Sequence, residues 1–363
     1  MNVVRETSQP ARYDEAVMAF ARPFPQGTAW RRASWLPVSD CSMNSPARRN
    51  VLMVVICLLA VGKSATAVAQ QARTKAPPPV DVTLTTKDGV QLQATYYPSS
   101  AGRQAVPVVM LHDFNETRAV FDPLARALQN PPAPASPTAP QIASRAVLAV
   151  DLRGHGGSKF SQTADGSTVE LESNRFQPGD FRAMVDFDME AVRSFLVEQN
   201  DAGKLNLNSL GLLGSGMGAN VALLWAAKDW SAPPLPVRKQ GQDVKALVLL
   251  SPRWNFNGLM LRDPLRFEPI QRQLSVLLAY GAEDRAVSKD CQDVIKILSK
   301  HHPEPPADRV EQLKDFFVYD PATNLQGTKL LTSDAFGIGQ KIFNFLEARL
   351  GRQAFPYSVR KNP

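Results

Sequence analysis

The sequence has few cysteines, and their scarcity limits the chemistry that the chain can carry out. Only Cys41, Cys57 and Cys291 occur among 363 residues, and of these Cys291 alone follows residue 69. Residues 70–363 therefore cannot form an internal disulfide, because a disulfide needs two thiols. A lone thiol is more often a small packed side chain than a nucleophile, so we assign Cys291 no catalytic role.

Histidines are scarce as well, and the four present (His112, His155, His301 and His302) predict no metal site. The last two are adjacent, and adjacent residues of a helix point to different faces, whereas zinc needs several converging ligands. The glycine-rich run at 214–218 superficially resembles a dinucleotide-binding turn but lacks the required spacing, and no Walker loop is present. We therefore expect no metal and no cofactor.

A strong excess of one charge is also missing from the part of the chain that is expected to fold. The formal net charge is +7, but residues 1–69 hold eight basic and four acidic side chains. Residues 70–363 keep 33 basic and 30 acidic residues. Because this balance is nearly even, the sequence offers no electrostatic argument for a nucleic-acid partner.

The one notable apolar run, at 51–62, is too short to span a bilayer comfortably. It follows the basic pair Arg48 and Arg49 and precedes Ala67 and Ala69, small residues at the two positions that a signal peptidase recognises. We predict a signal peptide at 43–69, cleaved after Ala69, and a protein that is periplasmic or secreted. The alternative is an uncleaved membrane anchor, which would be the chain's contact with a membrane.

Residues 1–42 precede this signal, although a signal normally begins near the start of a protein. They have no clear periodicity, and Met43 stands shortly before the basic pair. We predict that residues 1–42 are an upstream extension of a protein that begins at Met43, or else a disordered tail.

Strands and helical stretches alternate along residues 80–352, which predicts an α/β domain with a mostly parallel sheet of about eight strands and helices on both faces. The expected strands lie at 82–86, 90–97, 108–111, 146–150, 210–213, 244–250, 274–280 and 316–319. Pro-rich stretches at 130–144 and 230–242 predict surface insertions, and 159–180 a long polar loop. Residues 70–79 are expected to be a linker, and 353–363 a C-terminal tail.

Four short segments stand at strand ends in a characteristic order. They read LHDF at 111–114, DLRGHGGS at 151–158, LGSGMGAN at 213–220 and LLSP at 249–252. Together with the opening hairpin around Asp88 and Gly89, they resemble the α/β-hydrolase superfamily over nearly all of residues 81–350, and its dienelactone-hydrolase and esterase-like members in particular. The resemblance implies the α/β-hydrolase fold and a catalytic triad at three known places.

The first of these places is the nucleophile elbow, a sharp turn from strand to helix. Its nucleophile is strained, and the residues two before and two after it must be small. Gly214 and Gly218 satisfy that spacing, which puts Gly216 at the position of the nucleophile. Glycine suits the backbone but cannot attack a carbonyl. Ser215 is the fallback nucleophile, but a register centred on it would put Leu213 and Met217 where small residues are required.

The position of the triad acid holds an acidic residue, whereas the position of the triad base holds no histidine. Asp284 follows the seventh strand, where the resemblance implies the catalytic carboxylate, with Glu283 as a fallback; a carboxylate that caps the next helix is an equal alternative. The base should be a histidine after the last strand, in a His-Gly-Thr segment. Gln326 takes that position before Gly327 and Thr328. An amide cannot accept a hydroxyl proton near neutral pH.

The remaining site residues follow from the same resemblance. The backbone N–H groups of Phe114 and Met217 are the expected donors of the oxyanion hole, and His112, Asp113 and Ser251 are expected to line the cleft. Asp113 replaces the usual glycine beside His112, and a negative charge there would oppose the stabilisation of an anion.

Loss of two triad members predicts a catalytically inactive protein that binds a small ligand or a protein partner through the former active-site cleft. One alternative is a weak or atypical serine hydrolase of carboxylic esters or lactones that uses Ser215 and Asp284 with a base other than histidine. Another is a structural envelope protein whose two insertions make protein contacts. The ligand itself cannot be deduced from the fold.

Overall fold

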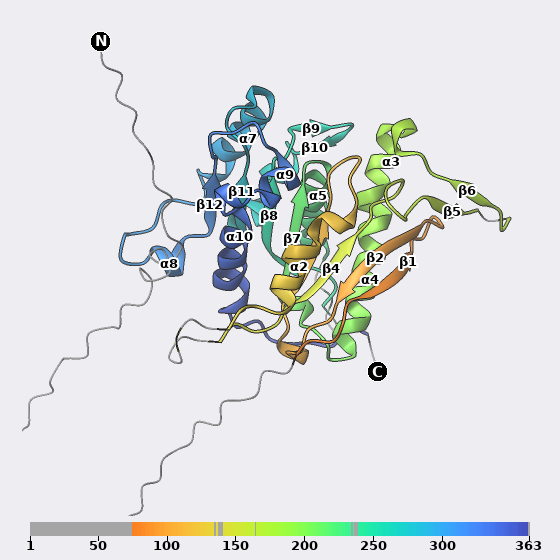
Figure 1. Ribbon diagram of the computed structural model, residues 1–363, viewed down its shortest axis with the longest axis horizontal. Helices are drawn as coiled ribbons and strands as arrows, with labels where there is room; N and C mark the ends of the chain where they lie inside the picture. Colours follow the sequence, from red (N-terminus) through yellow and green to blue (C-terminus); the bar gives the residue numbers. More distant parts are fainter. Residues whose placement is uncertain are drawn as a thin grey trace, which may run out of the picture. The chain divides into compact units, whose positions relative to one another are not determined.

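The computed structural model describes residues 75–133, 136, 141–163, 165–233, 235 and 239–361. The predictions for residues 1–42 and 43–69 lie outside the described residues, as do residues 70–74 of the linker. Residues 74–363 form one compact unit, which is coloured from orange to blue in Figure 1. In the part of the chain that the structure describes, no helix has the length and apolar character needed to cross a bilayer.

The core of this unit is an eight-stranded sheet, as the alternation of strands and helices predicted. Its order is β1-β2-β4-β3-β7-β8-β11-β12. The strands are β1 (Val80–Thr85), β2 (Gln91–Tyr97), β3 (Pro107–Leu111), β4 (Ala146–Val150), β7 (Leu210–Ser215), β8 (Val244–Leu250), β11 (Ser275–Ala279) and β12 (Phe316–Tyr319). β2 is antiparallel to both β1 and β4, and all the other pairs are parallel.

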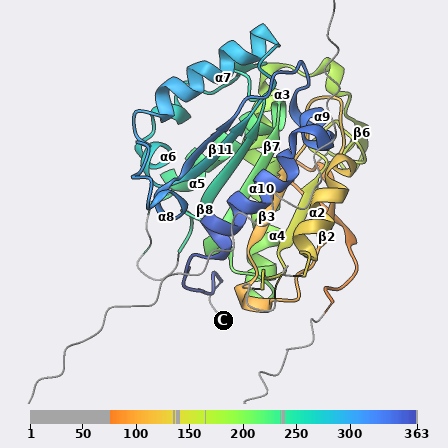
Figure 2. The same cartoon turned by 60° about the vertical axis from the view of Figure 1, so that its left-hand side comes forward.

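Helices cover both faces, because the central strands are apolar on both sides. Every residue of β3 is buried, and alternate residues belong to opposite cores: Val109 packs in one and Met110 in the other. The first core is covered by α4 (Met189–Asp201), α5 (Met217–Ser231) and α7 (Arg285–Leu298). The second is covered by α2 (Asp122–Gln129) and α10 (Ile338–Leu346), which cross the same side of the sheet in Figure 2.

Shorter elements connect these layers. They are α3 (Pro178–Ala183), α6 (Glu268–Arg272), α8 (Val310–Leu313), α9 (Gly327–Thr332) and the small hairpin of β9 (Asn255–Phe256) and β10 (Leu259–Met260). Residues 159–180, which we expected to be a polar loop, contain a second hairpin of β5 (Phe160–Gln162) and β6 (Thr168–Glu170). The sequence did not reveal it because its strands are short and largely exposed, and so lack an apolar alternation.

A buried ion pair holds the acidic residue Asp188 among the apolar residues that lead into α4. Asp188 ends a π-helical turn, Met184–Asp188, and its side chain is fully buried. Its Oδ1 accepts from Arg153 Nη2 at 2.6 Å, and Arg153 also pairs with Asp88 at 2.7 Å. The pair therefore joins the helix to the loop after β4 and to the turn between β1 and β2.

The segment expected to be a C-terminal tail is folded against the domain as far as residue 361. The Asn206 side chain donates to the Phe355 carbonyl at 2.8 Å, and Asn200 donates to the Ser358 carbonyl at 3.0 Å. Arg360 is buried and pairs with Asp243 at 2.7 Å. Polar side chains before β7 thus hold a segment that has no apolar periodicity of its own.

Candidate active site

The site expected from the sequence is built around the turn between β7 and α5. β7 ends at Ser215 and α5 begins at Met217, so Gly216 makes the whole turn, with φ 48° and ψ −112°. Its N–H donates to the Leu250 carbonyl at 2.8 Å, which ties the turn to β8. A side chain in this backbone conformation would be strained, and glycine is not.

The two glycines that flank the turn are there for steric reasons. A Cβ on Gly214 would overlap the backbone of Gly218 and Ala219. A Cβ on Gly218 would overlap the carbonyl groups of Leu111 and His112, at the end of β3. The residues two before and two after Gly216 therefore must be small.

Asp113 fills the space above Gly216. Its Oδ1 accepts hydrogen bonds from the backbone N–H groups of Met217, at 2.8 Å, and Phe114, at 2.7 Å. These are the two donors that the sequence analysis assigned to an oxyanion hole. A Cβ on Gly216 would overlap the Asp113 carboxylate itself. One carboxylate therefore occupies both the donor pair and the volume into which a side chain at residue 216 would extend.

The electrostatics of Asp113 reflect this position. Burial raises the pKa of its carboxyl, and the N–H groups of Met217 and Phe114 oppose that shift only in part. The nearby charge of Glu116 also raises the pKa, whereas that of Arg253 lowers it. The net result is a carboxyl with a pKa above its ordinary value.

Two neighbours hold the loop of Asp113 in place, and neither was identified from the sequence. Glu116 accepts from the Asp113 N–H at 3.2 Å through Oε2 and from the Thr328 hydroxyl through Oε1. The loop after β3 is thereby tied to the start of α9. The sequence carries no signal for this contact, because it joins residues more than 200 positions apart.

His112 is a structural residue. Its ring is fully buried, Nε2 accepts from the Leu152 N–H at 3.0 Å, and Nδ1 lies 2.7 Å from the Asp113 carbonyl. Because Nε2 accepts, Nδ1 must carry the proton. Burial lowers the pKa of His112 to about 4, so the ring stays neutral with both nitrogens engaged.

Ser215 lies directly before the turn but is closed off from solvent. It is fully buried, and its Oγ has no hydrogen-bond partner among the described residues. Gly327 covers it, since a Cβ on Gly327 would lie 2.5 Å from the Ser215 Oγ. A nucleophilic serine needs a base within hydrogen-bond reach, and the described surroundings of Ser215 supply none.

Gln326 binds the backbone after β11 rather than facing Gly216. Its Oε1 accepts from the Ser251 hydroxyl at 2.7 Å and from the Gly281 N–H at 3.1 Å, and its Nε2 donates to the Gly281 carbonyl at 2.8 Å. Ser251, whose φ is 50°, also accepts from the Gly327 N–H at 2.8 Å. The amide thus holds β8, β11 and α9 together.

The two carboxylates after β11 have separate structural contacts. Asp284 is the N-cap of α7, and its Oδ1 accepts from the N–H groups of Ala286 at 3.0 Å and Val287 at 3.1 Å. Glu283 is exposed and accepts from Asn324 at 3.2 Å. Within the described residues, no hydrogen bond links Asp284 to Gln326 or to Gly216.

An aromatic cluster lies beside Asp113, contributed by the loops after β3 and β4, by α3 and by β9. Phe114 stands 5.7 Å from Phe256, 6.1 Å from Phe181 and 5.3 Å from the ring of His155, measured between ring centres. Phe176 adds an edge contact with Phe181 at 5.8 Å. Phe176 stands in the stretch that we expected to be a polar loop, and the convergence of these rings depends on the fold. The described residues hold no group of three or more His, Cys, Asp or Glu side chains placed to bind a metal ion.

Comparisons with known proteins support the fold. The model of the α/β hydrolase family matches residues 108–337, more than half of the chain. An esterase from Pyrococcus furiosus has 16% identity and a TM-score of 0.51, with 76% of this chain and 92% of that one covered. Dienelactone hydrolase from Anabaena variabilis has 16% identity and a TM-score of 0.50, with 76% and 99% covered. At this identity the two structures support the fold alone. None of the curated protein sequences matches the chain.

The overlap at Gly216 predicts a strong coupling with Asp113. Gly216→Ala should lower the free energy of unfolding by about 2–5 kcal/mol, because the new Cβ meets the carboxylate in a strained turn. In an Asp113→Gly background the same change should cost about 1–3 kcal/mol less. Urea unfolding of the four proteins measures the coupling. Gly337→Ala is the control: its φ is 59°, but a Cβ there has open space. Additive effects at residues 113 and 216 would contradict the overlap.

The raised pKa of Asp113 predicts a pH-dependent cost of its charge. The pKa of Asp113 in the folded chain lies above the ordinary value of 3.8, so the folded chain binds this proton more tightly than the unfolded chain does. The free energy of unfolding therefore falls as the pH rises through the folded-state pKa. Asp113→Asn keeps the acceptor and removes the charge. Its free energy of unfolding relative to wild type should therefore increase as the pH rises from about 4, as measured by urea unfolding.

The matched control for this titration is the exposed Asp165, whose pKa is lowered to about 2, chiefly by the Thr163 hydroxyl. Asp165→Asn should gain no stability as pH rises, because the charged form is the one that is favoured there. A difference between Asp113→Asn and wild type that stays constant across the pH range would rule out the electrostatic account.

Proposed function

The chain belongs to the α/β-hydrolase family, and we propose that it is a non-catalytic member that binds a small ligand or a protein partner at the carboxyl edge of its sheet. The observation that carries the proposal is the Asp113 carboxylate, which accepts from the Met217 and Phe114 N–H groups. An ester carbonyl would need those same donors for its developing oxyanion. A carboxylate already bound there repels such an oxyanion and excludes it sterically.

The residues around the turn support the absence of a hydrolytic triad. Gly216 provides no nucleophile, and Gln326 is an amide whose oxygen and nitrogen are both bound to Gly281. Asp284 has its carboxylate committed to the first turn of α7. Each of the three triad positions thus has a structural role that does not depend on the other two.

Strained backbone supports binding at this edge. Four non-glycine residues in the described chain have a positive φ. Asn115 and Ser251 lie in the loops after β3 and β8, and Asn257 lies in the turn between β9 and β10. Backbone strain of this kind costs about 1–3 kcal/mol per residue and tends to gather at functional sites. Asn115 and Asn257 are exposed, so their side chains are accessible to a ligand or a partner.

The proposal predicts that wild-type protein shows no hydrolysis of p-nitrophenyl acetate that depends on Ser215. Rates of wild type and Ser215→Ala should be equal, because the buried Ser215 hydroxyl has no hydrogen-bonded base among the described residues. A wild-type rate that Ser215→Ala abolishes would instead favour the weak serine hydrolase.

Rebuilding the site tests which residues removed the activity. Asp113→Gly, Gly216→Ser and Gln326→His together should raise the rate at least roughly tenfold, since they free the donors and supply a nucleophile and a base. The control carries Gly216→Ala in place of Gly216→Ser and should show no gain. An equal gain in both would mean that residue 216 is not the nucleophile position.

We also propose that the protein is exported, on the basis of the basic pair, the apolar run at 51–62 and the alanines at 67 and 69. Expression of the full chain followed by cell fractionation and N-terminal sequencing tests this. The mature protein should begin at Gln70 and accumulate outside the cytoplasm. A chain that remains in the membrane fraction with residues 51–62 intact would indicate the anchor, and an uncleaved cytoplasmic chain would exclude export.

A further inference from the structure

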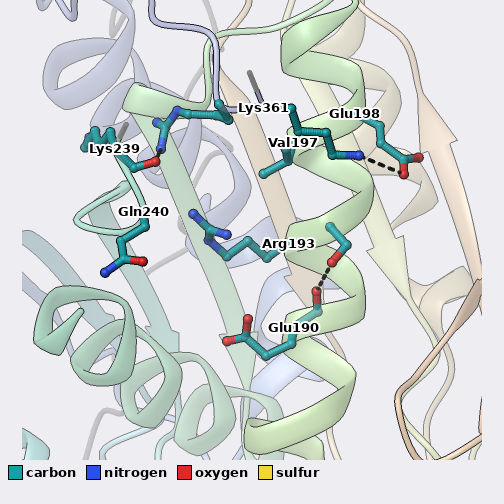
Figure 3. A pocket seen from close by; sticks show the side chains of 9 residues that line it. Glu190, Arg193, Val197, Glu198, Lys239, Gln240 and Lys361 are labelled. Carbon is teal, nitrogen blue, oxygen red and sulfur yellow. Dashed lines mark hydrogen bonds and ion pairs between the residues drawn. The ribbon is translucent and has the colours of Figure 1, made fainter. Parts of the chain in front are cut away.

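A second candidate site lies at the amino edge of the sheet, at the opposite end of β7 and β8 from Gly216. A pocket of about 570 Å³ opens there, a size that suits a small-molecule ligand. Its lining residues are Glu190, Arg193, Ser194, Val197, Glu198, Lys239, Gln240, Arg360 and Lys361. Figure 3 shows α4 as one wall, with Arg193 pointing from it toward Gln240 and Lys239.

Parts of the chain that the core sheet does not require form the other walls. Lys239 and Gln240 end the stretch expected to be an insertion, and Arg360 and Lys361 belong to the stretch expected to be a tail. Both stretches are anchored beside the pocket. Lys239 Nζ donates to Asn208 Oδ1 at 2.6 Å, and the Arg360 and Lys361 N–H groups donate to the Asp201 carboxylate, each at 2.8 Å.

Positive charge is in excess at the base of this pocket. Asp243 is fully buried, and three cations share it: Arg360 at 2.7 Å, Lys239 at 3.3 Å and Arg193 at 3.4 Å. One carboxylate cannot neutralise three cations. Two positive charges therefore remain before the neighbouring Asp229 is counted.

Asp229 offsets this excess only in part. Its Oδ2 accepts from the Asp243 and Val244 N–H groups, at 2.7 and 3.0 Å, and its Oδ1 has no partner among the described residues. Burial, and then the charge of Asp243, raise the pKa of Asp229 to about 6. An anion in the pocket would raise it further, and so favour the neutral form.

The two glutamates on the wall each lie near a lysine. Glu190 lies 3.7 Å from Lys228, which is closer to Asp186, at 3.3 Å, and Glu198 pairs with Lys361 at 3.5 Å. Glu190 therefore offsets a part of the excess, and the three cations that share Asp243 converge on the pocket from its different walls.

The guanidinium groups of the pocket have N–H donors that contacts within the described protein do not use. The Arg360 side chain is 2% exposed, and its Nε has no hydrogen-bond partner in the part of the chain that the structure describes. A buried donor without an acceptor destabilises the protein, and a bound oxyanion would supply the missing acceptor. The contact of Arg193 with Asp243 uses one of its nitrogens, Nη2, at a long distance of 3.4 Å.

We propose that this pocket binds a small molecule through a phosphate monoester group. A phosphate monoester carries close to two negative charges and three acceptor oxygens, which suits the excess of positive charge around Asp243, the fork of Arg193 and the unpartnered Nε of Arg360. Arg193 is the principal ligand-binding residue, with Lys239 beside it. The rest of the pocket volume accommodates the organic part of the ligand. This site is independent of the carboxyl edge, so either proposal can fail without the other.

Titration calorimetry of the full chain with phenyl phosphate, at constant ionic strength and in a buffer without phosphate, tests the assignment. We expect saturable binding with a Kd below about 1 mM. Arg193→Gln should raise the Kd at least tenfold, and Arg193→Lys should raise it less, because it keeps the charge but not the fork. The matched control is Arg272→Gln on α6, whose side chain is exposed and does not line the pocket; it should leave the Kd unchanged.

Inorganic phosphate and benzoate distinguish the group that is recognised. Phosphate should compete with phenyl phosphate, and benzoate should bind at least tenfold more weakly. Equal affinity for benzoate and phenyl phosphate would overturn the choice of phosphate over carboxylate. Absence of binding by wild type, or an unchanged Kd in Arg193→Gln, would overturn the site.

A footprint on wild-type protein keeps the proposal testable if Arg193→Gln does not fold. Phenyl phosphate should reduce acetylation of Lys239 and Lys361, as measured by mass spectrometry. It should not protect Lys289, an exposed lysine on α7. Equal acetylation of Lys239 and Lys361 with and without phenyl phosphate would contradict binding in this pocket.

Discussion

The turn between β7 and α5 is the constraint on which the carboxyl edge of this protein depends. A strand and a helix joined by one residue with φ 48° and ψ −112° leave no room for side chains at Gly214 and Gly218. With glycine also at the centre, the turn carries no side chain, and the volume above it has to be filled from elsewhere. Asp113 fills it from the loop after β3, and Gly327 covers the adjacent Ser215.

A hydrogen-bond donor pair of this kind has two opposite uses. Without an acceptor from the protein, the N–H groups of Met217 and Phe114 would be available to a developing negative charge. Bound to Asp113, they are satisfied within the protein and help to hold the loop after β3 in place. Burial raises the pKa of that carboxyl despite the two hydrogen bonds, so the arrangement retains an electrostatic cost. A cost retained at the centre of the site is consistent with a functional role for Asp113 beyond packing.

The two edges of the sheet differ in the charged groups that they hold. At the carboxyl edge, aromatic rings and the Asp113 carboxylate lie above the strands, and Gln326 joins β8, β11 and α9. At the amino edge, Arg193, Lys239 and Arg360 share the buried carboxylate of Asp243 beside a pocket. The fully buried strands β3 and β7 separate the two regions, so a ligand at one edge need not affect the other.

The sequence by itself determined the fold and the turn. Buried parallel strands are continuous apolar runs, so their places and order could be predicted, and the spacing of Gly214, Gly216 and Gly218 follows from local steric limits. The exposed β5–β6 hairpin and the packing of residues 353–361 were missed, because neither has an apolar period. Only the tertiary structure decided that Asp113 sits over Gly216, that Gln326 binds Gly281, and that Arg193, Lys239 and Arg360 meet at Asp243. Each of these contacts joins segments distant in the chain, and local pattern carries no information about which distant polar groups converge.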